Sequence, residues 1–150
     1  PEANVATLVT PLREKVALHD PSVVKAELTP WRRDIFQQEL YPQPDVWRAI
    51  TFSRAPVPSV RDWDDSLLDS NPPLFWQHVG VYAYRRSVLE KWDSLPESPL
   101  AEIESLEQLR LVEAGISIAA VRVDQTAQGI DTAADYAVFV DRFLSQQAGR

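Results

Sequence analysis

The spacing of hydrophobic and polar residues divides the chain into a strand-rich first half and a mixed second half. The β-rich runs 5–10 (VATLVT), 23–28 (VVKAEL) and 50–54 (ITFSR) predict strands. Residues 29–48 hold three prolines and two tryptophans, so we expect a surface excursion in which Trp31 and Trp47 are packing anchors. Residues 59–73 are polar and acidic and predict a loop.

Residues 76–84 (WQHVGVYAY) alternate with a period of two, which is typical of a strand with two different faces. We expect Val79, Val81 and Ala83 to supply the apolar core. The opposite face then carries Trp76, His78, Gly80, Tyr82 and Tyr84. Because glycine has no side chain, a partner could approach the backbone between His78 and Tyr82. A packed structural histidine and a ligand-binding face are equally good interpretations of this pattern.

Residues 98–115 (SPLAEIESLEQLRLVEAG) predict one continuous helix. Ser98 is the expected N-cap, Pro99 the first helical residue and Gly115 the C-terminal stop. A shorter helix is expected to begin at Ser87 and run to Trp92.

Two charged side chains fall inside the apolar sector of the predicted 98–115 helix. The sector consists of Leu100, Ile103, Leu106 and Leu111. Glu107 and Arg110 lie within it rather than opposite it. One interpretation is an ion pair that orients the helix, and the other is a functional role, because burying charges costs several kcal/mol before pairing offsets it. The residues alone leave the two evenly balanced.

The chain closes with a predicted helix in 129–147 (GIDTAADYAVFVDRFLSQQ), where Thr132 and Asp135 form a capping-box-like start. Its expected buried stripe is Tyr136, Phe139, Val140, Phe143 and Leu144. Residues 116–123 are β-rich and predict a further strand before this helix. The second half therefore runs strand, helix, helix, strand, helix, which favours an α/β fold with partly parallel strands. The chain has four glycines and no Gly-rich loop, so neither a P-loop nor a dinucleotide fingerprint is present.

Composition narrows the class of protein further. The length of 150 residues suits one domain, 1–150, with its own core. The net charge of −7 argues against a nucleic-acid surface. The absence of cysteine excludes disulfides and thiolate sites, and it fits a reducing, cytoplasmic compartment. The apolar runs are too short to span a bilayer, so we expect no membrane insertion.

A few residues could carry chemistry. Asp131 directly precedes the final helix, where either a turn residue or a hard oxygen ligand for Mg²⁺ would fit. Arg54 ends a strand and Arg61 follows shortly after; each could hold a carboxylate or phosphate, although surface arginines are commoner. Neither a Ser/His/Asp order, an HExxH motif nor zinc spacing is present in the sequence.

Several motifs, in order, resemble the C-terminal part of the 3-deoxy-manno-octulosonate (KDO) cytidylyltransferases, also called CMP-KDO synthetases. The motifs are FSRAPVP (52–58), QHVGVYAYR (77–85), SPLAEIESLEQLRLVEAG (98–115) and GIDT (129–132). The earlier NVATLVTPL (4–12) and DPSVVKAEL (20–28) also fit that family's middle region. The resemblance covers nearly the whole chain.

The resemblance implies a mixed sheet flanked by helices, as part of a Rossmann-like nucleotidyltransferase fold. It implies a reaction in which CTP and KDO give CMP-KDO and pyrophosphate with Mg²⁺, for lipopolysaccharide biosynthesis, in a homodimer. The residues that match the sugar-acid pocket are Arg54, Arg61, His78, Tyr82, Glu107 and Gln108. Asp131 resembles a metal-binding aspartate. Arg110 matches the motif without a clear role, and no residue is assigned to catalysis.

Two family features are missing from this sequence. The family's N-terminal half carries a basic loop that grips the triphosphate and an acidic turn with a second metal aspartate. We therefore expect a sugar-binding half that turns over little alone, with an unpaired sheet edge. The alternatives are a non-catalytic dimerisation or interaction module derived from the same fold, and a cytidylyltransferase for a related sugar acid.

Overall fold

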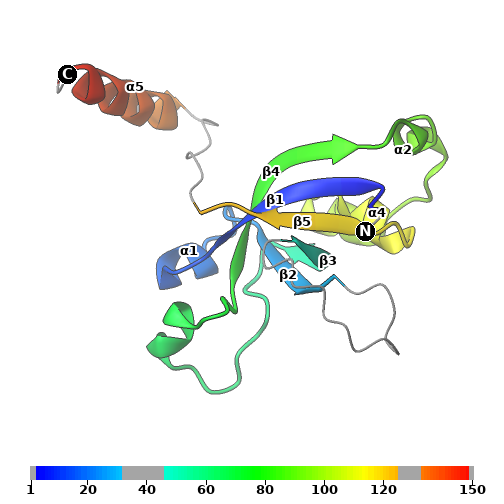
Figure 1. The fold of residues 1–150 in the computed structure, drawn as a ribbon, viewed down its shortest axis with the longest axis horizontal. Coiled ribbons are helices and arrows are strands. Elements are labelled where there is room, and N and C mark those ends of the chain that lie inside the picture. Colours follow the sequence, from blue (N-terminus) through cyan, green and yellow to red (C-terminus); the bar gives the residue numbers. More distant parts are fainter. Residues whose placement is uncertain (1–2, 32–45, 125–132, 149–150) are drawn as a thin grey trace.

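Five strands form the centre of the computed structural model, which describes residues 3–31, 46–124 and 133–148. The strands are β1 (Val5–Pro11), β2 (Lys25–Pro30), β3 (Val46–Ser53), β4 (Trp76–Tyr84) and β5 (Ile118–Arg122). They close into a barrel in the order β1-β4-β2-β3-β5 (Figure 1). β1 runs parallel to β5 and the other pairs are antiparallel. The predicted mixed sheet is confirmed, but pairing of β3 with β5 removes the expected free edge in this part of the chain.

The helices surround the barrel and are mostly short. They are α1 (Lys15–His19), α2 (Arg86–Leu89), α3 (Pro99–Glu104), α4 (Leu109–Glu113) and α5 (Ala133–Ala148), with 3₁₀ turns η1 (Asp65–Asp69) and η2 (Trp92–Ser94). α3 and α4 are neighbours, and α4 packs on β3. The main core joins inward strand residues to these helices. Its buried members include Val9, Phe52, Trp76, Leu109, Leu111 and Ile118.

The predicted single helix over 98–115 is wrong, because the chain turns between α3 and α4. Ser98 caps α3 through its hydroxyl, and Gly115 ends α4 with a positive φ, as expected. Ser105, however, has a φ of 51°, in the left-handed region. The Leu106 N–H donates to the Ala101 carbonyl at 3.0 Å, which is the bond pattern of a Schellman helix end. The turn rotates α4 relative to α3.

This turn changes which side chains are buried. Ile103, expected in the core, is 81% exposed, whereas Leu106 and Leu109 are buried. Glu107 therefore does not lie in a buried stripe: its side chain is exposed. A helical wheel drawn across a left-handed residue assigns wrong faces to everything beyond it.

The two faces of β4 are the reverse of the prediction. Trp76 is 3% exposed, and Tyr82 and Tyr84 pack against the main core, whereas Val81 is 58% exposed. The large aromatic rings bury more apolar area than valine or alanine, so they take the inner face. The His78 and Tyr82 face is thus the inner wall of the barrel, and not a surface opposite the core.

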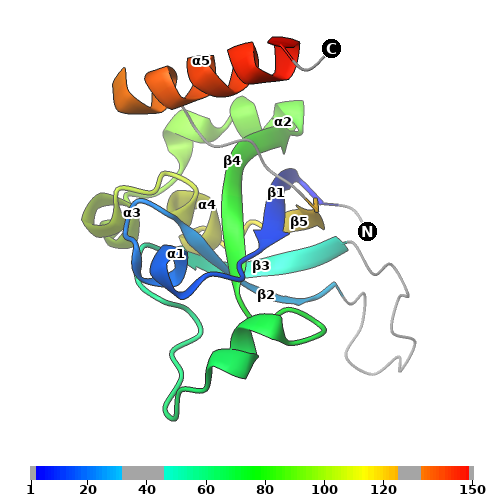
Figure 2. The ribbon, with the colours of Figure 1, turned by 90° about the vertical axis from the view of Figure 1, so that its left-hand side faces the viewer.

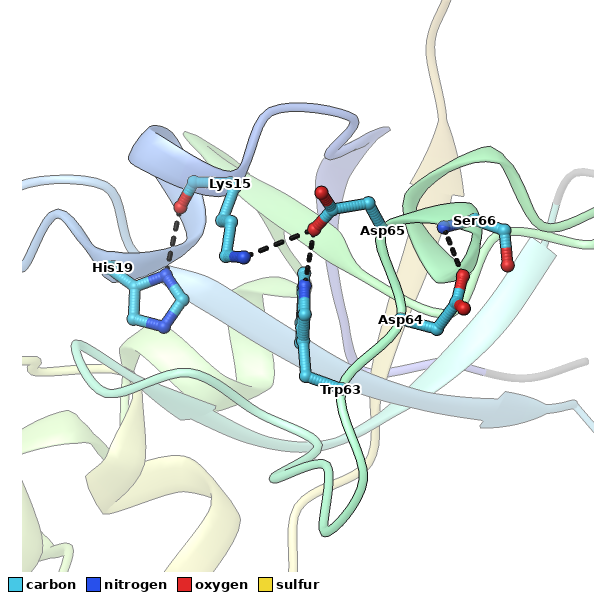
Figure 3. Close-up of polar contacts among 6 residues, drawn as sticks. All are labelled: Lys15, His19, Trp63, Asp64, Asp65 and Ser66. Carbon is cyan, nitrogen blue, oxygen red and sulfur yellow. Dashed lines mark hydrogen bonds and ion pairs between the residues drawn. The ribbon is translucent and has the colours of Figure 1, made fainter.

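A second, smaller core fixes the long segment between β3 and β4 to α1. Its buried members are Leu12, Leu18, Leu68 and Phe75. Figure 3 shows the polar contacts at its edge: the carboxylate of Asp65 accepts from Lys15 Nζ at 3.1 Å and from Trp63 Nε1 at 2.5 Å. These exposed contacts position η1 beside α1, away from α3 and α4 (Figure 2).

Two other expectations concern the ends of the described ranges. The 29–48 excursion is shorter than predicted, because β2 continues to Pro30 and β3 begins at Val46. Its remainder, 32–45, lies outside the described residues, as do Asp131 and Thr132.

The final helix is confirmed, but its apolar stripe is not buried. Tyr136, Phe139, Phe143 and Leu144 are exposed on α5, which stands off the barrel (Figure 1). In the described ranges, no helix is long and apolar enough to cross a membrane.

A substitution at Ser105 tests the turn. Ser105→Gly should stabilise the chain by roughly 0.5 kcal/mol, because glycine adopts a positive φ without the penalty that a Cβ carries. In a continuous helix the same change would destabilise by about 1 kcal/mol, as Ala101→Gly within α3 should. Urea unfolding measures the change in the free energy of unfolding for Ser105→Gly and for Ala101→Gly. A Ser105→Gly variant that is less stable than the parent chain would contradict the turn.

Candidate functional site

Arg54 lies just after β3, and backbone carbonyls hold its guanidinium in place. Nε donates to the carbonyl of Glu104 at 2.7 Å, Nη1 to that of Pro21 at 2.9 Å, and Nη2 to that of Ser105 at 3.2 Å. A guanidinium has five N–H donors in a fixed plane. These three bonds fix the plane and leave one N–H on each Nη. The two remaining N–H groups are free to bind an anion such as a carboxylate.

Glu104 ties the backbone at the end of β3 to the end of α3. Its carboxylate accepts from the Ser53 hydroxyl at 2.7 Å and from the Arg54 backbone N–H at 2.9 Å. Arg54 is therefore held through its backbone N–H, by Glu104, and through its guanidinium, by three carbonyls. The connection fixes the four residues that follow Glu104, 105–108, which we call the elbow.

The elbow exposes one polar side chain between two buried ones. Leu106 and Gln108 are buried, and Glu107 between them is exposed. This alternation of buried and exposed side chains follows from the positive φ of Ser105 on one side and the start of α4 at Leu109 on the other. Glu107 thus projects from a turn that is held at both ends. Arg54, which follows β3, binds this turn through the carbonyl of Ser105.

Arg110 supports the other end of the elbow. Its Nη2 donates to the Leu95 carbonyl at 2.9 Å, and its guanidinium lies over the ring of Trp92, 5.7 Å from the centroid. Of the two interpretations of Glu107 and Arg110, the ion pair is not observed: neither residue takes part in the salt bridges of the described ranges. Arg110 holds the backbone that leads into α3.

His78 lies within the barrel wall, beside β1. Its Nε2 is 3.0 Å from the Thr7 hydroxyl oxygen, and its ring contacts Phe52 at a centroid distance of 4.9 Å. Thr7 is also 2.9 Å from the Val81 carbonyl, to which its single hydroxyl proton can be donated. Nε2 must then carry the hydrogen that Thr7 accepts, and Nδ1 remains an acceptor. Burial lowers the pKa of His78 to about 4, so the ring is neutral at pH 7.

Tyr82 follows His78 on the same inner face, at 5.4 Å between ring centroids. By geometry its hydroxyl oxygen is buried and makes no hydrogen bond within the part of the chain that the structure describes, as is also true of Trp47 Nε1 and Arg122 Nε, although the Thr7 hydroxyl lies near enough to lower the pKa of Tyr82. Burial raises the pKa of the Tyr82 hydroxyl, and the charge of Glu107 contributes. A buried hydroxyl without a partner is unusual, and it can be satisfied by a ligand.

The aromatic face of β4 links this tyrosine to the elbow. Tyr84 stacks on Tyr82 with centroids 5.6 Å apart, and it contacts Trp92. Burial raises the pKa of Tyr84, and the negative charge of Glu107 raises it further. Glu107 therefore lies close enough to both tyrosines for its charge to act on them. The elbow, Arg54 and the inner face of β4 form one candidate site.

A surface hollow of about 410 Å³ lies between α3 and α4. Residues that line it include Ser98, Glu102, Ser105, Glu107 and Arg110. Of the residues predicted for the sugar-acid pocket, Glu107 alone borders this hollow. His78 and Tyr82, by contrast, lie on the inner face of β4, and Arg54 follows β3.

Arg61 and Asp131 are not brought into this cluster by any recorded contact. The Arg61 side chain is exposed on the segment between β3 and η1. Asp131 lies outside the described residues. Within the residues the structure does describe, no group of three or more His, Asp or Glu side chains is placed to hold a metal ion.

Three residues important to the site were missed in the sequence. Thr7, Lys25 and Glu104 each hold a site residue in place. A lysine in the middle of the apolar run VVKAEL is a signal of a buried charge. The role of Glu104 depends on its contacts with Ser53 and Arg54, which are distant in sequence.

Comparisons with known proteins agree on one family. A sequence model of the cytidylyltransferase family matches residues 1–118. A 3-deoxy-manno-octulosonate cytidylyltransferase of Rhodopirellula baltica is 43% identical over 147 residues, which are 97% of this chain and 53% of that protein. A protein of the same name from Gemmatimonas aurantiaca is 50% identical over 91 residues, 61% of this chain and 34% of its own length.

A solved structure gives the same result for the fold. It is described as CMP:2-keto-3-deoxy-manno-octonic acid synthetase complexed with CTP, and it matches with a TM-score of 0.72 at 35% identity. The match covers 98% of this chain and 51% of that one. The chain is thus a mixed α/β protein like this synthetase, and it spans about half the length of the curated relatives it matches.

The neutral His78 predicts how stability depends on pH. An unfolded histidine takes up a proton near pH 6.5, whereas folded His78 stays neutral down to about pH 4. The unfolded state therefore binds the proton first, so stability is lost as the pH falls through this window, by about 3 kcal/mol in total. Urea unfolding from pH 7 to pH 4 measures it. His78→Gln, which keeps an N–H donor for Thr7, should lack this component, and an unchanged pH profile would contradict it.

Proposed function

Because the chain belongs to the cytidylyltransferase family, we propose that it is the sugar-acid-binding part of an enzyme that activates KDO with CTP. The products would be CMP-KDO, for lipopolysaccharide biosynthesis, and pyrophosphate. The observation that carries the proposal is Arg54, anchored beside the elbow with two N–H groups left over. That arrangement offers a carboxylate clamp next to an exposed carboxylate, Glu107, which can accept hydrogen bonds from sugar hydroxyls.

In the proposed mechanism, the residues of this chain orient the sugar. Arg54 would hold the KDO carboxylate, Glu107 and Gln108 would bind hydroxyls, and the Tyr82 hydroxyl would gain its missing partner. Neutral His78 would offer Nδ1 as an acceptor. The anomeric hydroxyl oxygen then attacks the α-phosphorus of CTP and loses its proton to solvent, the bond from the α-phosphorus to the oxygen that bridges to the β-phosphate breaks, and pyrophosphate leaves. Holding the two reactants in line supplies much of the rate enhancement.

We propose that CTP is held mainly by a portion of the enzyme that corresponds to the part of the relatives this chain does not match. The sequence contains no phosphate-binding loop, and the relatives are about twice as long. The whole of 1–150 would then be one portion of a Rossmann-like nucleotidyltransferase domain. Asp131 remains a proposed Mg²⁺ ligand, where the metal would neutralise phosphate charge. Arg61 remains a proposed sugar-acid contact, and a cytoplasmic homodimer remains the proposed setting.

A second candidate is an interaction module without catalysis. The exposed apolar side chains of α5 favour it, because amphipathic helices of this kind usually pack against something. It gives no reason for an anchored Arg54 or an unpaired buried hydroxyl. A third candidate, a cytidylyltransferase for a related sugar acid, shares the whole mechanism and differs only in the sugar.

Tyr82→Phe separates binding from stability. Removing a buried hydroxyl that lacks a partner should stabilise the free chain by about 1 kcal/mol, while KDO affinity falls roughly tenfold because the ligand loses one hydrogen bond. Calorimetric titration and urea unfolding measure the two quantities. Tyr136→Phe, on exposed α5, is the matched control and should change neither. A Tyr82→Phe variant with unchanged KDO affinity would remove Tyr82 from the site.

Measurement of turnover tests whether this chain binds the sugar acid while another part of the enzyme binds CTP. Pyrophosphate release from CTP, KDO and Mg²⁺ should be absent with this chain alone and should appear when the N-terminal half of a longer relative is added. Glu107→Ala should reduce that release at least tenfold, as expected for loss of a charged hydrogen-bond partner. Release by the chain alone would contradict the proposed nucleotide site, and no release from a folded mixture would favour the interaction module.

A further inference from the structure

Lys25 is a fully buried cation that no part of the proposed mechanism uses. Its exposed fraction is 0%, and it begins β2. Its Nζ donates to three backbone carbonyls: those of Asp20 at 3.0 Å, Val23 at 2.6 Å, and Arg54. An ammonium has three N–H donors, so this group is completely satisfied without any carboxylate partner. A buried charge is costly, and packing alone would be better served by an apolar side chain.

The three carbonyls come from two segments that are distant in sequence. Asp20 and Val23 belong to the turn between α1 and β2, which the Asp20 carboxylate shapes by accepting from the backbone N–H and hydroxyl of Ser22. Arg54 belongs to the end of β3. Lys25 therefore clamps this turn against the residue that begins the carboxylate site.

The clamp continues to the elbow through Arg54. Lys25 holds the Arg54 carbonyl, Glu104 holds the Arg54 N–H, and the Arg54 guanidinium holds the carbonyls of Glu104 and Ser105. The guanidinium also holds the carbonyl of Pro21, in the same turn that Lys25 binds. Lys25, Arg54 and the turn that contains Asp20 and Pro21 are thus joined in a ring of hydrogen bonds. The Arg54 guanidinium extends this network to Ser105, two residues before Glu107.

We propose that Lys25 is a positioning residue for the sugar-acid site: through the backbone of Arg54 it fixes both the guanidinium plane and the elbow that displays Glu107. The inference rests on the proposed function for the identity of the ligand, but the coupling from Lys25 to the elbow does not. Lys25 touches no substrate in this account, and it acts only through Arg54.

The test compares Lys25→Met, which is similar in length and has no donors, with Lys25→Arg, which keeps the charge and the donors. Backbone amide chemical shifts of 105–108 report the elbow, and calorimetry reports KDO affinity. Lys25→Met should shift the elbow amides and weaken KDO binding about tenfold or more, as supporting partners of a binding site commonly do. Lys25→Arg should restore most of both. If Lys25→Met does not fold, Lys25→Gln, with two donors, replaces it.

Leu68→Ala is the control for general destabilisation, because Leu68 is buried in the second core, which Val23 touches only through its side chain, and no hydrogen bond joins Leu68 to Lys25, Arg54 or Glu104 among the described residues. It should lower thermal stability while leaving the elbow shifts and KDO affinity unchanged. A folded Lys25→Met or Lys25→Gln chain with unperturbed elbow amides overturns the proposal. Perturbed elbow amides in a chain whose parent binds no KDO would keep the coupling and refute the proposed function instead.

Discussion

The bonds between Arg54 and Glu104 are the constraint on which the candidate site depends. They join the end of β3, in the barrel, to the end of α3, outside it. Without them the left-handed Ser105 would be a local helix end and nothing more. With them, the turn becomes a fixed platform for Glu107, and the arginine that makes the platform also offers its remaining donors to a ligand. Structure and proposed function are therefore carried by one network of charge-assisted hydrogen bonds.

The barrel wall supplies the rest of the site through its aromatic face. Four aromatic rings contact one another in succession, with centroids of neighbouring rings between 4.9 and 5.6 Å apart: Phe52, His78, Tyr82 and Tyr84. Burial there keeps His78 uncharged and leaves the Tyr82 hydroxyl unpaired among the described residues. The Tyr82 hydroxyl is the kind of buried polar group that a sugar can satisfy.

The sequence predicted the strands and the caps well because these depend on local chemistry. Ser98, Pro99 and Gly115 do what their residue types favour at helix ends, and the alternating run 76–84 is a strand. The errors came from long-range effects. Nothing local in IESLEQLR indicates that Ser105 takes a positive φ, since serine seldom does, and the choice of inner face on β4 depends on what fills the barrel. Family resemblance named Arg54, His78, Tyr82 and Glu107, but not the buried Lys25, which binds the carbonyl of Arg54.

Mapping of KDO on the chain by NMR tests the central claim most directly. Titration of KDO into isotopically labelled chain should shift the signals of Arg54, Tyr82 and elbow residues 105–108, all with one dissociation constant. Shifts confined to α5 or to the α1 and η1 surface, or no shifts in a folded chain at millimolar KDO, would contradict the account that these residues form a sugar-acid site.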